Sequence, residues 1–308
     1  MTKPDRPSTP AYAPHTAFAA PALASNQIGK LITGILAVEL LFALGLIMLG
    51  NALEGLSPGF AYTYVSGTTP IGLILQLLSF ALLIVSIGFV LKRHHNRHLL
   101  TTLGDPIAAI QTLVAVFLGV AMLHLALEIL PPWWDTAAIS EKRHLIAWAL
   151  TVPFGLFALL IQTSAEEVFY RGYIQQQVAA RFSNPVIWMV APNLLFAFAH
   201  WDNGVTTVDR WQYVIWAFFF GLAASDLTAR TGNLGAAIGL HLANNAFAFM
   251  LYGEIGGNDS GLALFLLPEM TGQPGGGGQS GPVLTMGLFI DLVVVWMSWL
   301  AARIAIRR

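Results

Sequence analysis

The stretch "LIAWALTVPFGLFALLIQTSAEEVFYRGY", residues 145–173, places three charged side chains after twenty-one uncharged residues. A membrane-spanning helix needs about 20 mostly apolar residues, so the first part of this stretch is long enough to be one. Glu166, Glu167 and Arg171 then follow within six residues. An ionisable side chain inside a bilayer costs at least about 2.5–3.5 kcal/mol, so it usually faces a cavity or a partner. The stretch therefore predicts a membrane helix with a polar site near its end.

The composition of the whole chain is that of a membrane protein. Of its 308 residues, 56% are hydrophobic and 10% are charged, whereas a soluble domain carries about 25% charged residues. The net charge of -1 gives no indication of a nucleic-acid partner. The chain has no cysteine, which excludes disulfides, thiolate metal sites and a cysteine nucleophile.

Apolar runs along the chain predict an all-α, polytopic membrane bundle of about eight transmembrane helices. The expected spans are residues 31–50, 70–91, 106–130, 145–168, 185–200, 211–228, 234–252 and 283–305. With the N-terminus inside, twelve of the 15 lysines and arginines fall on the cytoplasmic side, as the positive-inside rule requires. The strongest inside marker, "KRHHNRH" at 92–98, is interpreted as a solvated basic loop, with a metal-binding tract as the alternative. The expected location is the inner (plasma) membrane, with both termini cytoplasmic.

These spans divide the chain into five regions. Residues 1–27 are rich in Pro, Ala, Ser and Thr and are expected to form a disordered cytoplasmic tail. The other expected regions are N-terminal helices over 28–140, a core of helices four to seven over 141–255, a mobile glycine-rich outer loop over 256–282, and helix eight with a basic cytoplasmic end over 283–308.

The charged residues after the fourth span have two interpretations. Glu167 and Arg171 lie four residues apart on a helix, so they can pair. Glu166 is rotated by about 100° from Glu167 and points at a neighbouring surface. One interpretation is a polar site within the membrane. The other is the cytoplasmic end of the helix, with its charges among the lipid headgroups.

Two further segments place polar side chains in or at the end of a span. His200 ends the apolar run "LLFAFAH", where the helix dipole favours a histidine. His241 and Asn245 lie four residues apart and project from one face of the seventh span. Gly235 and Gly239, on the same span, predict the close approach of another helix. Helix capping or interface hydrogen bonds explain each segment alone, whereas together the segments offer several groups suited to acid–base chemistry.

Four other ionisable residues fall inside expected spans. His124 and Glu128 are four residues apart and could pair with each other. Glu39 and Asp291 lie deep in the first and last spans. Structural hydrogen bonding is the favoured interpretation of all four residues, and a substrate or proton path is the alternative.

Three elements, "EEVFYR" at 166–171, "FAFAH" at 196–200 and "HLANN" at 241–245, resemble the EExxxR, FxxxH and HxxxN motifs of the CPBP family of intramembrane proteases. This is the CAAX prenyl protease 2 (Rce1-like) group, also called the abortive infection domain. The resemblance covers about residues 145–255, and it implies peptide-bond hydrolysis inside the membrane. The implied roles are Glu166 as the general base that activates water, His200 holding that water with Glu167 orienting it, Arg171 pairing with Glu167, and His241 with Asn245 donating to the oxyanion.

The need for a metal stays open at this point. Glu166, His200 and His241 could bind Zn²⁺ and leave an open position for water. A glutamate mechanism without metal fits the same motifs, and the chain has no "HExxH" sequence.

The resulting expectation is an intramembrane endopeptidase that cuts a peptide or membrane-protein substrate near the cytoplasmic face of the lipid bilayer. A non-catalytic membrane scaffold or immunity factor of the same fold is one alternative. A transporter that uses the intramembrane carboxylates is the other. The sequence does not select a prenylated substrate or an oligomeric state.

Overall fold

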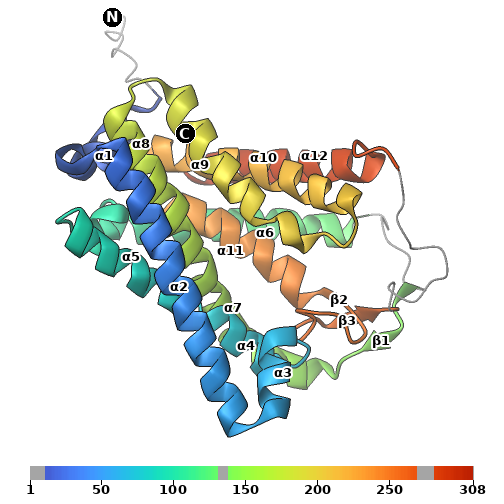
Figure 1. Cartoon of the computed structure of the whole chain (residues 1–308). Coiled ribbons are helices and arrows are strands. Elements are labelled where there is room, and N and C mark those ends of the chain that lie inside the picture. Colours follow the sequence, from blue (N-terminus) through green and yellow to red (C-terminus); the bar gives the residue numbers. More distant parts are fainter. Residues whose placement is uncertain (1–10, 131–137, 269–280, 308) are drawn as a thin grey trace, which may run out of the picture.

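The computed structural model describes residues 11–130, 138–268 and 281–307, which form an all-α bundle with one small sheet (Figure 1). The helices are α1 (Ala13–Ala19), α2 (Ile28–Leu56), α3 (Pro58–Ser66), α4 (Pro70–Leu78), α5 (Ala81–His94), α6 (Pro106–Ile129), α7 (Leu145–Glu167), α8 (Gln176–Arg181), α9 (Pro185–Ala199), α10 (Thr207–Thr231), α11 (Gly235–Met250) and α12 (Met286–Ala305). A π-helical segment, Val168–Gln175, joins α7 to α8. Short 3-10 turns lie at Ala20–Ser25, Leu99–Thr102 and Trp201–Asn203.

The starts of several helices follow from their local sequence. Proline begins α3, α4, α6 and α9, where its fixed φ and its missing N–H are both tolerated. The preceding side chain in each case accepts a hydrogen bond from a backbone N–H of the first turn, and these caps are Ser57, Thr69, Asp105 and Asn184.

Within the described residues, five helical segments are long and apolar enough to cross a membrane, namely Ile28–Leu56, Pro70–His94, Pro106–Ile129, Leu145–Arg181 and Met286–Ala305. Helices α9 and α11 have only 15 and 16 residues, and α10 carries charged residues near both ends. The all-α membrane bundle is thus confirmed, whereas the expected count of eight spans is not.

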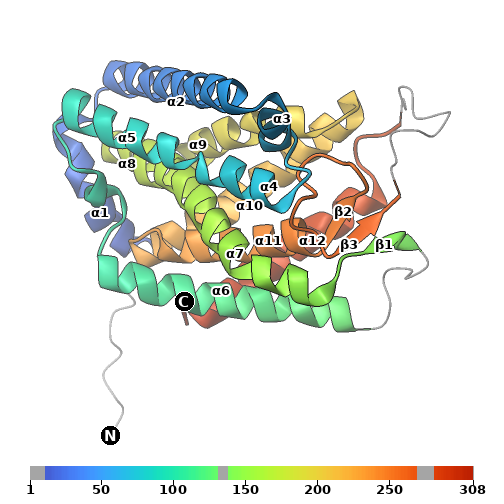
Figure 2. The ribbon, with the colours of Figure 1, turned by 90° about the horizontal axis from the view of Figure 1, so that it is seen from below.

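Two expected spans differ from the structure in their continuity. The span at 70–91 is divided into α4 and α5 at Ser79 and Phe80, whose backbones stay in the helical region, and the two helices together form the segment Pro70–His94. The span expected to end at 168 instead continues through the π-helical segment to Arg181, over 37 residues. Helix α7 runs between α4 on one side and α11 on the other (Figure 2).

The expected disordered tail is wrong for residues 11–27, while residues 1–10 lie outside the described part. Helix α1 packs beside α8 and α10 (Figure 1). The His15 ring stacks on Trp188 with 4.2 Å between ring centroids, and the Tyr12 hydroxyl donates to Asp226 at 2.7 Å. Phe18 is buried in the main core. These aromatic side chains give the segment enough apolar area to dock, although its composition is typical of a tail.

The glycine pair on α11 permits a close helix contact, as the sequence predicted. A Cβ atom added at Gly235 would lie 1.8 Å from the Ala109 carbonyl oxygen of α6. One added at Gly239 would lie 2.5 Å from the Leu113 carbonyl oxygen. The backbones of α6 and α11 therefore approach each other at a distance that larger residues would prevent.

A three-stranded sheet closes one end of the bundle. Its strands are β1 (Glu141–Lys142), β2 (Tyr252–Glu254) and β3 (Phe265–Leu267), in the order β1-β3-β2. Strand β3 pairs antiparallel with β1 and parallel with β2. The expected mobile outer loop over 256–282 therefore contains regular structure in its first part, and residues 269–280 lie outside the described part.

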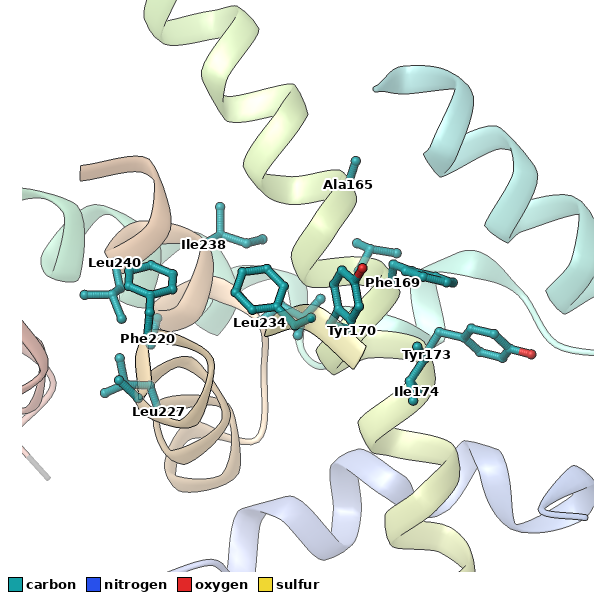
Figure 3. Close-up of a cluster of buried hydrophobic side chains, with 14 of the residues drawn as sticks. Ala165, Phe169, Tyr170, Tyr173, Ile174, Phe220, Leu227, Leu234, Ile238 and Leu240 are labelled. Carbon is teal, nitrogen blue, oxygen red and sulfur yellow. The ribbon is translucent and has the colours of Figure 1, made fainter. Parts of the chain in front are cut away.

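Buried apolar side chains from α7, the π-helical segment, α10 and α11 surround the centre of the bundle (Figure 3). Those labelled are Ala165, Phe169, Tyr170, Tyr173, Ile174, Phe220, Leu227, Leu234, Ile238 and Leu240. This core holds the side chains described below in fixed positions.

Candidate active site

The two adjacent glutamates lie inside a long helix and not at its end. Glu166 and Glu167 are the last residues of α7, and the π-helical segment and α8 continue from them to Arg181. The charges therefore do not end the helix, whereas their depth relative to the lipid headgroups stays a prediction. A π-helical turn widens the helix by one residue and is frequent at functional sites. Here the π-helical segment begins directly after Glu167 and contains Arg171.

Glu167 is the centre of a fully buried ionic group. Its Oε1 atom accepts a hydrogen bond from Nη1 of Arg171 at 2.9 Å, and both side chains are 0% exposed. The predicted pairing of Glu167 with Arg171 is confirmed. The same oxygen lies 2.8 Å from Nδ1 of His241, on α11. Glu167 therefore joins the first and third motifs and is directed at a histidine, whereas the resemblance implied an orienting role at the water.

Arg171 is held at its second terminal nitrogen by α9, which is bonded in turn to α10. Its Nη2 atom donates to Oδ1 of Asn193 at 3.1 Å, and the guanidinium lies 4.4 Å from the centre of the Phe196 ring. Asn193 in turn donates to the Ser225 hydroxyl at 2.8 Å. A Cβ atom added at Gly221 would lie 2.4 Å from Asn193 Oδ1, so this glycine leaves the space that the amide occupies.

Glu166 is held differently from its neighbour, because its side chain is partly exposed while its Oε2 atom is buried and makes no hydrogen bond to another described residue. Its side chain is 14% exposed, and its Oε2 atom lies 3.6 Å from Nε2 of His241. Its Oε1 atom accepts a hydrogen bond from Nε2 of Gln162 at 2.7 Å. The Oε1 atom of Gln162 accepts a hydrogen bond from Nδ2 of Asn245 at 3.0 Å. The first and third motifs are thus joined a second time, through an amide that belongs to neither motif.

His200 ends α9 beside this group. Its Nδ1 atom lies 2.8 Å from the carbonyl oxygen of Phe196. A carbonyl can only accept, so Nδ1 carries the hydrogen and Nε2 of the neutral ring keeps a free lone pair. The Phe196 ring is 4.5 Å from His200 and 6.2 Å from His241 between centroids, and therefore lies between the two histidines.

The residues considered as metal ligands are not gathered. In the part of the chain that the structure describes, there is no group of three His, Asp or Glu residues that could hold a metal ion. The suggested set of Glu166, His200 and His241 therefore does not form such a group.

Of the basic loop at 92–98, His95 and Arg97 are buried. His95 uses its ring nitrogens on Ser25 and Tyr173, so the loop is partly packed and not simply solvated.

The four other intramembrane ionisable residues lie elsewhere. Glu128 accepts a hydrogen bond from Tyr252 at 2.8 Å, and His124 stacks on Phe247, so the expected His124–Glu128 pair does not form. Glu39 and Asp291 are exposed on the surfaces of α2 and α12. Neither makes a hydrogen bond to another described residue, so the structural hydrogen bonding expected of these two is wrong.

Comparison with known proteins places this site within a segment that matches a known family. Residues 148–247 match the family model described as "Type II CAAX prenyl endopeptidase Rce1-like". This segment is similar to the Rce1-like family. It contains all seven residues of the three motifs, and Gln162 and Asn193 as well. The resemblance stated from the motifs is thereby confirmed.

One curated relative of the chain is the "Uncharacterized protein YyaK" of Bacillus subtilis (strain 168). It is 27% identical over 147 residues, which are 45% of this chain and 46% of that protein. The chain thus spans about half the length of the relative that it matches. No solved structure matches the chain.

Sequence reasoning missed two residues of the matched segment that hold the motif side chains. Gln162 and Asn193 are both buried amides inside otherwise apolar helices. A polar side chain within a membrane segment costs free energy unless it has a partner, so each amide is itself a signal. Gln162 also lies one helical turn before Glu166, which is the spacing at which side chains meet.

Proposed function

We propose that the chain is an intramembrane endopeptidase in which Glu166 is the general base that activates water. One observation carries this assignment. Of the two adjacent glutamates, Glu167 is fully buried and occupied by Arg171 and His241, whereas Glu166 is 14% exposed. A general base needs a carboxylate oxygen free to accept a proton from water. Oε2 of Glu166 has no hydrogen-bond partner among the described residues and is not bound by a cation, so we assign Glu166 as the base and Glu167 as the residue that orients His241.

The proposed reaction begins when Glu166 removes a proton from water and the new hydroxide attacks the carbonyl carbon of the substrate. The free Nε2 lone pair of His200 can accept the other hydrogen of that water and hold it. The tetrahedral intermediate collapses with cleavage of the C–N bond, and protonated Glu166 gives its proton to the leaving amine. A single carboxyl group thus transfers the proton from the nucleophile to the leaving group.

The developing oxyanion is assigned to His241 and Asn245. Glu167 fixes Nδ1 of His241 as a donor, so Nε2 can donate to the oxyanion only when the ring carries a second proton. Asn245 uses one hydrogen of its amide on Gln162 and keeps the second for the substrate. Donors fixed before the reaction stabilise such charge strongly, typically by a hundredfold or more per donor.

The proposed setting is the inner (plasma) membrane, with both termini cytoplasmic and the cut on the cytoplasmic side. Basic residues lie at the end of α5 and of α8, and these ends belong to the cytoplasmic side under the positive-inside rule. The proposed substrate is a peptide or a membrane protein. The name of the matching family describes prenylated substrates, and such a substrate is one arm of the test below.

The test compares wild type with Glu166→Gln, both purified in detergent and incubated with a peptide library that includes prenylated peptides. Cleavage is read by mass spectrometry, with and without a chelator. Wild type is expected to cut and Glu166→Gln is expected not to, because glutamine keeps the shape of glutamate and cannot act as a base. The matched control is Asp291→Asn, an exposed carboxylate on α12 that should be dispensable.

Each outcome has a distinct meaning. Equal cleavage by wild type and Glu166→Gln would show that Glu166 is not the base. Loss of cleavage in Asp291→Asn but not in Glu166→Gln would assign the essential carboxylate to α12 and not to α7. Activity that disappears with the chelator and returns with Zn²⁺ would show that a metal participates.

A further inference from the structure

Gln162 lies in the interior of α7, one turn before Glu166, and belongs to none of the three motifs. Its side chain is buried, with a residue exposure of 7%. It donates to Oε1 of Glu166 at 2.7 Å and accepts from Nδ2 of Asn245 at 3.0 Å. We infer that Gln162 is a positioning residue that sets the orientation of the general base and of an oxyanion donor together. This inference rests on the proposed function.

The direction of the hydrogen bonds follows from the chemistry of the groups. An ionised carboxylate can only accept, so Glu166 requires the NH₂ end of the Gln162 amide. The oxygen of Gln162 must then face Asn245 and can only accept, so Asn245 must present its own NH₂ group. The oxygen of Asn245 accepts in turn from Nδ2 of Asn244 at 3.2 Å. The result is a one-way chain of three hydrogen bonds from Asn244 to the Glu166 carboxylate, in which each bond polarises the next.

This chain fixes the plane of the Glu166 carboxylate from one side, and His241 faces it from the other. Oε1 is bound by Gln162, and Oε2 lies 3.6 Å from Nε2 of His241. The same amide holds Asn245 in the orientation in which one hydrogen points to Gln162 and the second is left for the substrate. A single buried glutamine therefore positions both Glu166, the proposed base, and Asn245, the proposed oxyanion donor.

A variant without the amide should lose turnover and keep binding. Gln162→Met has a similar length and neither donor nor acceptor, so the base loses one fixed hydrogen bond and Asn245 loses its acceptor. A hydrogen bond to a charged group corresponds to about a ten- to hundredfold effect, so kcat is expected to fall by that factor. KM should stay within about twofold, because Gln162 lies behind the reacting groups and does not contact substrate.

A second variant separates positioning from packing through its pH dependence. In Gln162→Glu, the ionised carboxylate can accept from Asn245 but repels Glu166. Once protonated, it can donate its O–H to Glu166 as the amide did. The kcat of this variant relative to wild type should therefore rise as the pH is lowered from 8 to about 5, while the ratio for Gln162→Met stays constant.

The control is Thr163→Val at the adjacent position. Thr163 is 0% exposed, and its hydroxyl bonds to the Leu159 carbonyl of its own helix. Its replacement changes a buried polar group of α7 without touching Glu166 or Asn245, so kcat should be retained. If this control loses as much kcat as Gln162→Met, the effect belongs to the packing of α7 and the inference is wrong.

The outcomes also separate this inference from the proposed function. If wild type cuts, Glu166→Gln does not, and Gln162→Met keeps the wild-type kcat, only the positioning role is overturned. A constant kcat ratio for Gln162→Glu across the pH range overturns it as well, and this measurement decides alone if Gln162→Met does not fold. If Glu166→Gln cuts as well as wild type, the proposed base is wrong and the inference falls with it.

Discussion

Nδ1 of His241 lies 2.8 Å from Oε1 of Glu167, although 74 residues of chain separate the two side chains. An ionised carboxylate accepts only, so this contact fixes the hydrogen of His241 on Nδ1 and turns Nε2 toward Glu166. The same carboxylate oxygen binds Arg171. Glu167 is therefore the point at which α7, the π-helical segment and α11 are held in one arrangement.

Breaking the buried pair of Glu167 and Arg171 should destabilise the protein strongly. Arg171→Met leaves a buried carboxylate without its cation, and the expected loss in unfolding free energy is about 3–5 kcal/mol. The double variant Glu167→Gln, Arg171→Met should lose less than the sum of the two single losses, because no charge is left without a partner. Reversible unfolding in mixed detergent measures these free energies. Additive losses would show that the two side chains act independently.

Gly221→Ala should displace the amide that holds Arg171. The new Cβ atom would lie 2.4 Å from Asn193 Oδ1 and 3.0 Å from Nη2 of Arg171. The expected cost is about 1–3 kcal/mol, as for other over-packed sites. The matched control is Gly50→Ala in α2, where an added Cβ meets nothing within 4 Å, so the variant should be neutral or gain up to about 1 kcal/mol. Equal melting temperatures for the two variants would contradict the close packing at Gly221.

The docked N-terminal segment should make stability depend on pH. Burial lowers the pKa of His15 to about 4. Burial, followed by the charges of His94 and Arg97, lowers the pKa of His95 to about 4 as well. The unfolded chain, with a histidine pKa of about 6.5, therefore binds more protons than the folded protein between these values. Stability is fully present above about pH 6.5, falls by up to about 1.4 kcal/mol per pH unit for each histidine, and levels off below about pH 4.

Thermal melting at pH 7 and pH 5 measures this dependence. His15→Phe keeps an aromatic ring against Trp188 and cannot take a proton, so its melting temperature should fall less between the two pH values. An unchanged difference in this variant would mean that His15 is not the group that titrates.

The two motif histidines should differ in what they do for the fold. His200 bonds only to a carbonyl of its own helix, so His200→Ala should change the unfolding free energy by no more than about 0.5 kcal/mol. His241→Phe leaves the buried Glu167 without one of its two partners, and about 1–3 kcal/mol should be lost. Both variants should lose activity if the proposed function is correct. Equal stabilities would place His241 outside the ionic group at Glu167.

Hydrophobic runs located the helices well, because a run of about 20 apolar residues in a membrane can satisfy its backbone hydrogen bonds only by forming a helix or a closed barrel. They did not show that the span at 70–91 is divided into α4 and α5. They also did not show that the helix continues beyond α7 to Arg181. The segment after Glu167 is polar in sequence, and it stays helical because its side chains are buried against α1, α5, α9 and α10.

The motifs located the site residues, and helical spacing correctly paired Glu167 with Arg171. Spacing cannot report contacts between helices, so the approach of His241 to Glu167 was not foreseen. The amides of Gln162 and Asn193 were passed over because neither carries a charge. The docking of residues 11–27 was missed because three aromatic or histidine side chains outweigh a composition that is otherwise typical of a tail.

The hydrogen bond between Tyr12 and Asp226 spans 214 residues of chain, and this separation sets an order in time. Tyr12 is synthesised near the start of the chain. Asp226, which accepts the hydrogen bond from its hydroxyl, is synthesised only after α2 to α9. Until then the N-terminal segment can contact α8 and, through Trp188, α9, but its contacts with α10 cannot form. Its full docking is therefore among the last steps of assembly, and a chain arrested during synthesis before α10 could not complete it.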